Sequence, residues 1–337
     1  MNPNERTFRR TVGAIGGTML IFLLCINLLR VVLMLLDAIL IEFEVPVLWG
    51  NLIFYAVYAA GYLASFMLPV AFMKLFIRKK GLDWAPMQTS WRISPWWLLA
   101  VPAGIAIIFS ASYLNAIFVS VFGLFGTGSG SMEELAQVLT SRAMPYEWVI
   151  QFIVICLVPG FCEEFLFRGA ILTNLLPFGR SNAILMSALL FSLMHQNPSQ
   201  FFYAFVAGIV LGVLYERTGS IWPGTVLHIC NNFASVGESI LPYGFANDFR
   251  AMLAGAVMEL VIAFLGVISI AILILRYFSK PRDFRGGVFG STEGSVCVAS
   301  AYPIEKGRWV KLFLSPTMVI FLVLCILEVI PLMLGGY

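Results

Sequence analysis

Charged side chains and histidine are both scarce in this chain of 337 residues. Asp, Glu, Lys and Arg make up 12% of it, against about 25% in soluble domains, whereas hydrophobic residues make up 60%. This composition excludes an ordinary soluble protein and predicts an integral membrane protein. The net charge of only +3, without a long basic stretch, also argues against a nucleic-acid partner, because neutralising many phosphates requires clustered Lys and Arg.

The cysteines provide no disulfide framework and no recognisable metal site. The six of them show no C-x-x-C pair and no zinc-ribbon spacing, and most lie inside apolar stretches. We interpret them as small core residues. A His-Glu-x-x-His motif is absent as well, which removes the most familiar sequence signature of a zinc protease.

Long apolar runs bounded by charge or by Pro and Gly indicate transmembrane helices. Six runs are long enough to cross roughly 30 Å of hydrocarbon, namely 12–36, 47–72, 96–125, 148–172, 251–275 and 312–334. Three further candidates follow the fourth run, at 183–195, 201–215 and 221–241. The first two are short and could form recessed helices or a re-entrant pair. The sequence therefore predicts an all-α polytopic membrane protein, a bundle of about eight to nine transmembrane helices.

The distribution of basic residues predicts how the chain lies in the membrane. With nine crossings and a cytosolic N-terminus, most of the 21 Lys and Arg residues fall on the cytosolic side, as the positive-inside rule requires. The first apolar run is too long for a signal-peptide h-region, so we expect it to remain as an anchor. We expect a multi-pass protein of a bacterial-type cell membrane, with membrane lipid around it.

The runs divide the chain into three parts. Residues 1–145 hold three transmembrane helices and loops, 146–245 form a helical core, and 246–337 hold two transmembrane helices with a connecting loop. The segment 81–95 is either a strip at the headgroup level or an ordinary cytosolic loop. The Gly- and Ser-rich segment 286–300 is typical of a flexible linker.

A cluster of polar groups inside the apolar runs falls in the middle part. They form three patterns with a helical spacing of four, Glu163-Glu164-x-x-x-Arg168, Phe191-x-x-x-His195 and His228-x-x-x-Asn232. Positions four apart share a helix face, so Glu164 should lie over Arg168 as a structural pair while Glu163 points elsewhere. The three patterns also lie at a similar depth. Since ionisable groups in hydrocarbon cost at least a few kcal/mol each, the cluster predicts a functional site.

These side chains could hydrolyse a peptide bond. A carboxylate beside an imidazole can take a proton from water and make the water a nucleophile toward a carbonyl carbon. The resulting oxyanion needs donors, which His228 and the Asn232 amide can supply. Cys230 and Ser192 lie nearby in the sequence and stay open as alternative nucleophiles.

Other polar residues in the apolar runs favour a structural interpretation. Arg30, Glu259 and Glu328 are single intramembrane charges, best explained by packing, snorkelling or an ion pair. Gly208-x-x-x-Gly212 is best explained by close helix packing.

Together the motifs resemble a known family. Glu163-Glu164-x-x-x-Arg168-Gly169, Phe191-x-x-x-His195, Gly208 and Gly212 followed by Thr218-Gly219-Ser220, and His228-x-x-x-Asn232 are similar in order and spacing to the CPBP intramembrane endopeptidases. That family includes the CAAX prenyl endopeptidases and proteins of bacteriocin processing and self-immunity. The resemblance extends from about Pro159 to Leu241; the flanking runs match only in being hydrophobic.

The resemblance implies a role for each residue. Glu163 would be the general base that activates water, assisted by His195; His228 and Asn232 would stabilise the oxyanion. Glu164, Arg168 and Phe191 would support the site. The implied substrate is a membrane-anchored or lipid-modified, CAAX-like peptide or protein.

Two questions stay open at this stage. We favour a mechanism without a cofactor, but Glu163, His195 and His228 could also supply the three ligands of a catalytic Zn²⁺ and make the protein an intramembrane metalloprotease. The alternatives to an enzyme are a non-catalytic immunity protein and a proton-coupled transporter.

Overall fold

The computed structural model describes residues 3–90, 95–123, 149–150, 152–244, 249–279, 304 and 308–333. These residues are built from helices and contain no β-strand, apart from an isolated β-bridge between Thr89 and Ser220. The predicted all-α membrane fold is confirmed. The predicted linker at 286–300 lies outside the described residues.

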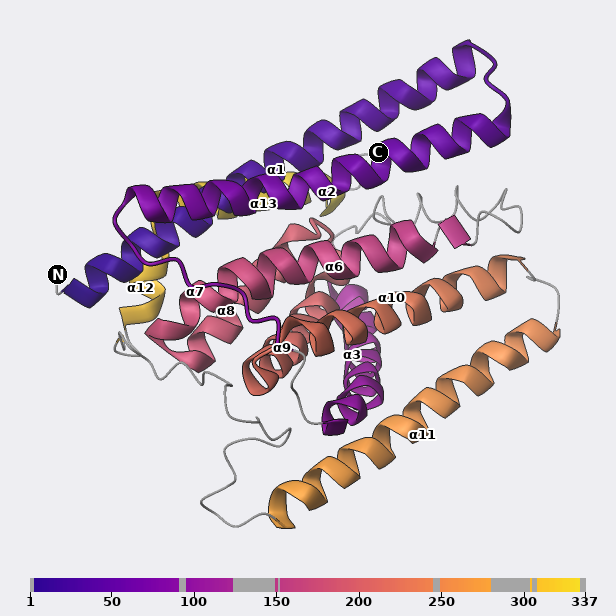
Figure 1. Ribbon diagram of the computed structural model, residues 1–337. Helices are drawn as coiled ribbons and strands as arrows, with labels where there is room; N and C mark the ends of the chain where they lie inside the picture. Colours follow the sequence, from indigo (N-terminus) through magenta and orange to yellow (C-terminus); the bar gives the residue numbers. More distant parts are fainter. Residues whose placement is uncertain are drawn as a thin grey trace.

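Three long helices precede the polar cluster in the chain. α1 (Pro3–Glu42) and α2 (Val47–Lys79) form a hairpin that projects beyond the rest of the molecule in Figure 1. A short 3-10 segment, η1 (Pro95–Leu99), leads into α3 (Ala100–Gly123). With 40 and 33 residues, α1 and α2 extend well beyond the apolar runs that predicted them.

The next helix changes its hydrogen-bond pattern along its length. It consists of π-helical η2 (Phe152–Leu157), α6 (Val158–Glu164), π-helical η3 (Phe165–Leu172), α7 (Thr173–Leu175) and 3-10 η4 (Leu176–Phe178). The sequence predicted a membrane-spanning helix over 148–172. The hydrophobic pattern could not reveal the π turns, because a run that is apolar on every side carries no periodicity to be disturbed.

The predicted short pair proves to be unequal. α8 (Arg180–Met194) has 15 residues, which at 1.5 Å per residue spans only about 22 Å and leaves the helix shorter than the hydrocarbon core. α9 (Pro198–Thr218) is long and apolar enough to span, and α10 (Ile221–Gly244) follows it closely. A Cβ at Gly208 would lie 2.8 Å from the Cα of Ala188, so this glycine packs α9 against α8, as the sequence predicted.

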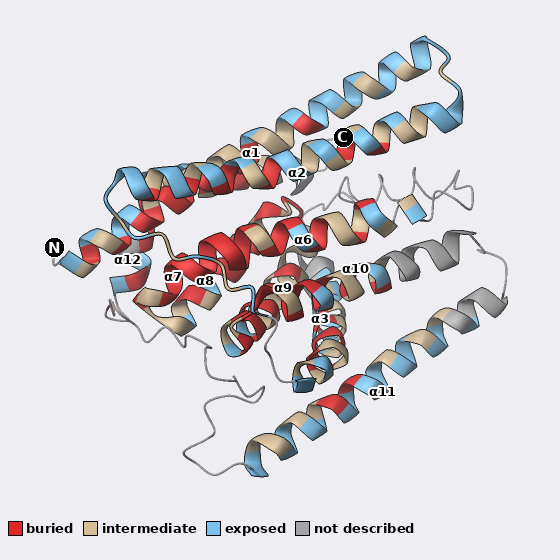
Figure 2. Cartoon of the chain, in the orientation of Figure 1, coloured by how far each residue is buried: buried red, intermediate tan, exposed pale blue. Residues whose placement is uncertain are grey.

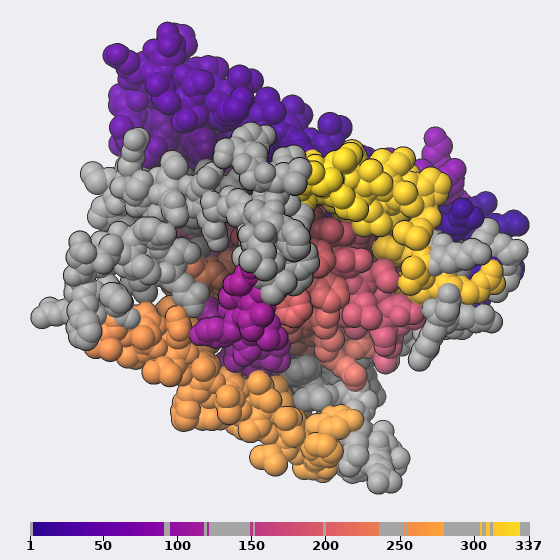
Figure 3. All heavy atoms as spheres, turned by 180° about the vertical axis from the view of Figure 1, so that it is seen from behind, coloured from indigo at the N-terminus to yellow at the C-terminus, as the bar shows by residue number. Residues whose placement is uncertain are grey.

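The C-terminal part returns to the start of the chain. α11 (Phe249–Ser279) packs against α3, whereas α12 (Trp309–Phe313) and α13 (Pro316–Met333) pack against α1. A Cβ at Gly16 would lie 2.6 Å from the backbone nitrogen of Met318, so α1 and α13 are in backbone contact. From behind, the yellow C-terminal helices lie beside the indigo N-terminal ones and orange α11 crosses the opposite side (Figure 3).

Five of the described helices are long and apolar enough to cross a membrane, and two shorter apolar helices cover 180–194 and 316–330. The predicted orientation of the N-terminus and the bacterial-type membrane stay predictions. So does the division into three parts, although one hydrophobic cluster draws residues from all of them.

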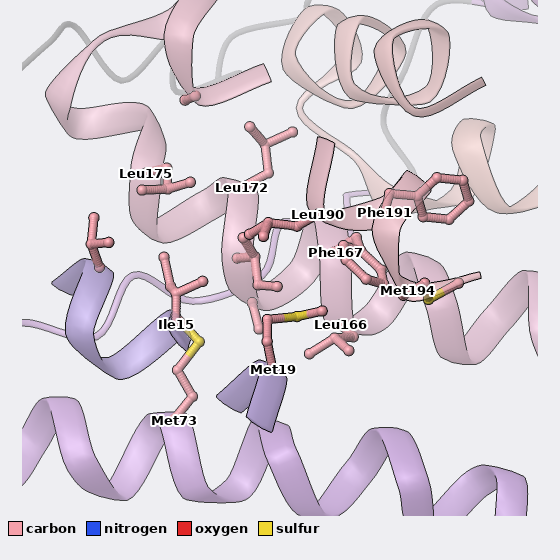
Figure 4. Packing of buried hydrophobic residues seen from close by; sticks show 14 of the residues in the cluster. Ile15, Met19, Met73, Leu166, Phe167, Leu172, Leu175, Leu190, Phe191 and Met194 are labelled. Atoms are coloured by element: carbon pink, nitrogen blue, oxygen red, sulfur yellow. The ribbon is translucent and has the colours of Figure 1, made fainter. Parts of the chain in front are cut away.

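The core lies where α1, α2, η3 and α8 meet. Figure 4 shows side chains from these elements that belong to one hydrophobic cluster, among them Met19, Met73, Leu166, Leu190 and Phe191. In Figure 2 the buried positions gather on these central elements, whereas α11 and the far end of the α1–α2 hairpin are largely exposed. The exposed side chains there are apolar, such as Leu260 and Phe264, which suits contact with lipid.

The segment between α2 and η1 is attached to helix ends. The Ala85 amide donates to Oδ1 of Asn174 at 3.1 Å, and the Ile221 amide donates to the carbonyl of Gln88 at 2.9 Å. The described part of the predicted headgroup strip or loop therefore closes one end of the bundle, against α7 and the start of α10.

Candidate active site in the helix bundle

The helix that carries the two glutamates is built to let another helix approach closely. Pro159 occupies its α-helical start between the two π-helical segments, and π turns of this kind often occur at functional sites. A Cβ at Gly160 would lie 2.7 Å from Cγ1 of Ile229 on α10. The small residue thus brings α10, and His228 with it, against Glu163 and Glu164.

Glu164 and Arg168 form the predicted pair. Nη1 of Arg168 donates to Oε1 of Glu164 at 2.8 Å, and the two side chains are 1% and 0% exposed. The guanidinium also donates to the carbonyl of Gly208 at 3.2 Å and lies over the ring of Phe191, 4.5 Å from its centroid. A buried charge pair with these additional partners ties η3 to α8 and α9.

Glu164 has a second partner that its own helix could not reveal. Nδ1 of His228 lies 3.0 Å from Oε1 of Glu164, the same oxygen that binds Arg168. A carboxylate at Nδ1 fixes the orientation of an imidazole and leaves Nε2 facing the other way. Glu164 therefore holds α10 as well as its own helix.

Glu163 lies on the other side of the same imidazole. Its Oε2 is 3.7 Å from Nε2 of His228, and this oxygen is buried without a hydrogen-bond partner among the described residues. Its Oε1 accepts a hydrogen bond of 2.6 Å from the hydroxyl of Tyr62 on α2. The His228 ring is thus enclosed by two consecutive carboxylates, and one oxygen of Glu163 stays available for a ligand.

Tyr62 is a site residue that the sequence did not indicate. Its ring stacks on that of Tyr58, with centroids 5.6 Å apart, and packs at a tilt against that of Phe66, with centroids 4.8 Å apart; both neighbours are one helical turn away. That spacing marks an aromatic face on α2, which is ordinary in a buried helix. Nothing in the sequence relates it to a carboxylate about a hundred positions away.

His195 lies directly after the last residue of α8 and is half-buried. Its Nδ1 lies 2.8 Å from the carbonyl oxygen of Phe191, a contact that leaves Nε2 free to accept a proton when Nδ1 carries one. The ring of Phe191 contacts both imidazoles, at centroid distances of 5.1 Å to His195 and 5.8 Å to His228. Phe191 therefore orients both histidines, whereas the sequence related it to His195 alone.

Asn232 lies one turn beyond His228 on α10 and is half-buried. Among the described residues, no hydrogen bond joins its amide to Glu163 or to either histidine. The neighbouring Asn231 instead pairs with the hydroxyl of Tyr203 at 2.8 Å and connects α10 to α9. The helical spacing thus places Asn232 on the side of His228, and its predicted role depends on a substrate.

The geometry gives no support to the zinc alternative. Among the described residues, which include Glu163, His195 and His228, no group of three His, Cys, Asp or Glu side chains could hold a metal ion. The predicted metalloprotease alternative is therefore unsupported. The hydroxyl of Ser192, the alternative nucleophile, donates a hydrogen bond to the carbonyl of Phe201 at 2.5 Å and so has a structural partner.

Comparison with known proteins points to the same segment. Residues 145–234 match the family of type II CAAX prenyl endopeptidase Rce1-like proteins, and this range contains all four motifs from Glu163 to Asn232. No curated protein and no solved structure matches the chain. The match confirms the resemblance that the motifs predicted. Together with the apolar helices, it supports an integral membrane protease of the CAAX type in general.

Proposed function

We propose that this protein is an intramembrane endopeptidase that hydrolyses peptide bonds of membrane-anchored or lipid-modified, CAAX-like substrates with a water molecule activated by Glu163. The observation that carries the proposal is the pairing of Glu163 and His228 across 3.7 Å inside the segment that matches the Rce1-like family. At this separation the buried carboxylate oxygen and the imidazole nitrogen do not form a direct hydrogen bond, so we infer that they bind a reactant between them.

The distance suits a shared water molecule. At 3.7 Å, Oε2 of Glu163 and Nε2 of His228 are too far apart for a good hydrogen bond. A water oxygen to one side of the line between them can be about 2.8 Å from both atoms. Because the hydroxyl of Tyr62 holds Oε1, the carboxylate cannot turn away from this position without losing that bond.

The reaction then follows from the remaining groups. Glu163 takes one proton from the water while the water oxygen attacks the scissile carbonyl carbon. In this scheme His228 carries a proton on both ring nitrogens, of which Nδ1–H donates to Glu164. Nε2–H of His228 and the amide of Asn232 then donate hydrogen bonds to the oxyanion. The proton passes to the leaving nitrogen, assisted by His195, and the carbon–nitrogen bond breaks to give a carboxylic acid and an amine. No step requires a cofactor.

Glu164 and Arg168 act as support in this scheme. Their ion pair holds the shared Oε1 beside Nδ1 of His228, so the imidazole keeps Nε2 directed at Glu163. Phe191 packs against the imidazoles and the guanidinium and limits how far they can tilt.

The test is a comparison of newly formed peptide termini in membranes that contain wild-type or Glu163→Ala protein. We expect termini that depend on Glu163, and loss of at least about 10²-fold in the rate for a purified peptide containing such a site. Glu163→Gln keeps the shape and removes the base, so it should be equally inactive. Cleavage by Glu163→Ala at the wild-type rate would refute the assignment of the base.

Metal dependence needs its own measurement. We expect purified active protein to contain no stoichiometric metal and to keep its rate after exhaustive chelation. Loss of activity on chelation that returns with Zn²⁺ would instead favour the metalloprotease. A non-catalytic immunity protein would keep its full biological function in the Glu163→Gln variant. A transporter would carry ions across the membrane and would hydrolyse no peptide.

A further inference from the structure

A second group of polar residues joins α1, α13 and the turn after α8, apart from the proposed catalytic groups. Nδ2 of Asn27 on α1 donates to Oε1 of Glu328 on α13 at 2.9 Å, and Nη1 of Arg30 donates to Oδ1 of Asn27 at 3.1 Å. Nε2 of Gln196, in the turn between α8 and α9, donates to Oε2 of Glu328. We call these four residues the Glu328 network.

The network ends at the residue that follows His195. Gln196 has a φ of +54°, a left-handed conformation that is uncommon for a residue other than glycine, and it is 7% exposed. The backbone amide of Gln196 donates to the carbonyl of Leu193 at 3.2 Å, and this bond closes the last turn at the end of α8. A residue in this conformation needs contacts that keep it there, and Glu328 supplies a charged acceptor.

His195 depends on this helix end for its position. Among the residues that the structure describes, its ring contacts Phe191, four residues earlier in the sequence. Those contacts set the tilt of the imidazole on α8 but not its distance from Glu163, which belongs to a different helix. The distance depends on where the end of α8 is held relative to the rest of the bundle.

We propose that Glu328 is a positioning residue, which binds Gln196 and thereby fixes His195 in the site. The proposal rests on the proposed function, because it assigns a purpose to the position of His195. The helix that carries Glu328, α13, is itself held against α1. Its backbone approaches Gly16 of α1, and Thr317 donates to the carbonyl of Gly13 at 2.9 Å. Asn27 donates to the half-buried carboxylate of Glu328, and the exposed Arg30 donates to Asn27 and so places a positive charge nearby.

The chain offers a direct readout, because it contains only two histidines. Protein labelled with ¹³C and ¹⁵N at histidine, in lipid nanodiscs, should give two imidazole signals, assigned with a His195→Asn variant. We expect Glu328→Leu to shift or split the His195 signal while that of His228, held by Glu164, stays in place. Glu328→Gln can still bind Asn27 and Gln196 and should restore the wild-type His195 signal.

Activity provides the second readout. Because a misplacement of about 1 Å can cost up to about 10²-fold in rate, we expect Glu328→Leu to lower kcat on the order of tenfold, with KM within about twofold. Glu328→Gln should recover most of kcat. Gln196→Leu breaks the same contact from the other side, leaves the bond between Asn27 and Glu328 intact, and should reproduce both effects if Glu328→Leu fails to fold.

The matched control is Glu259→Leu, which removes an exposed glutamate of α11 and should change neither histidine signal nor kcat. An unchanged His195 signal or an unchanged kcat in Glu328→Leu would overturn the positioning role. Failure of the proposed function looks different: Glu163→Ala would then cleave like the wild type, while the histidine spectra still report whether Glu328 holds His195.

Discussion

The interrupted helix from η2 to η4 and the long helix α11 are both apolar and both carry glutamate, but the glutamate side chains lie in different environments. In the interrupted helix, Glu164 is fully buried and binds Arg168 and His228. In α11, Glu259 is exposed between apolar neighbours that face outward, such as Leu260. Figure 2 shows this contrast between the buried centre and the exposed α11.

The difference shows how a membrane protein can keep charge where it needs it. A buried carboxylate loses its water and is tolerated only when cationic and hydrogen-bonding partners replace that water. Arg168 and His228 provide this at Oε1 of Glu164, whereas a glutamate at the surface of α11 can reach toward headgroups or water. Substitutions should therefore have large effects at the centre and small ones on α11.

The largest effect is expected from Arg168→Met. It leaves Glu164 buried without its guanidinium partner, and breaking a buried ion pair in this way costs about 3–5 kcal/mol. The free energy of unfolding, measured by denaturant titration in detergent micelles, should fall by that amount. Adding Glu164→Gln removes the orphaned charge and should recover part of the loss. A single variant as stable as the wild type would contradict the contrast with α11.

A smaller effect, on rate rather than stability, is expected from Tyr62→Phe. The change removes the hydroxyl that binds Oε1 of Glu163, and a hydrogen bond to a charged group is worth about 1.5–3 kcal/mol. If Tyr62 holds the base in place, kcat should fall by roughly tenfold to a hundredfold, with little change in the unfolding midpoint.

The control for this experiment lies one turn earlier on the same face of α2. Tyr58 stacks on Tyr62, but its hydroxyl does not bind Glu163. Tyr58→Phe should therefore leave kcat within about twofold, because a surviving aromatic ring keeps the packing. Equal rates for Tyr62→Phe and wild type would mean that packing alone orients Glu163.

The sequence predicted those features of the site that depend on local spacing. The pairing of Glu164 with Arg168 follows from positions four apart, and the structure confirms it. The fold class was predictable for a similar reason, since length and apolarity alone indicate a helix that spans a membrane. The family resemblance depended on the same short motifs.

Contacts between distant segments could not be predicted. Tyr62 meets Glu163 across 101 positions and Gln196 meets Glu328 across 132, and no periodicity connects such residues. The sequence treated Arg30 and Glu328 as separate charges, whereas Asn27 joins them. The spacing along one helix determines only which residues of that helix share a face. Which faces of different helices meet is determined by how the helices pack.

The smallest effect is expected from Glu259→Leu on α11. The carboxylate is exposed, so replacing it leaves no buried charge or cavity behind. The free energy of unfolding should change by no more than about 0.5 kcal/mol, and the rate of peptide cleavage should stay the same. Denaturant titration and a kinetic assay on one preparation would measure both. A loss of more than about 1 kcal/mol would show that Glu259 has a partner in the folded bundle, and exposure would no longer distinguish the two regions.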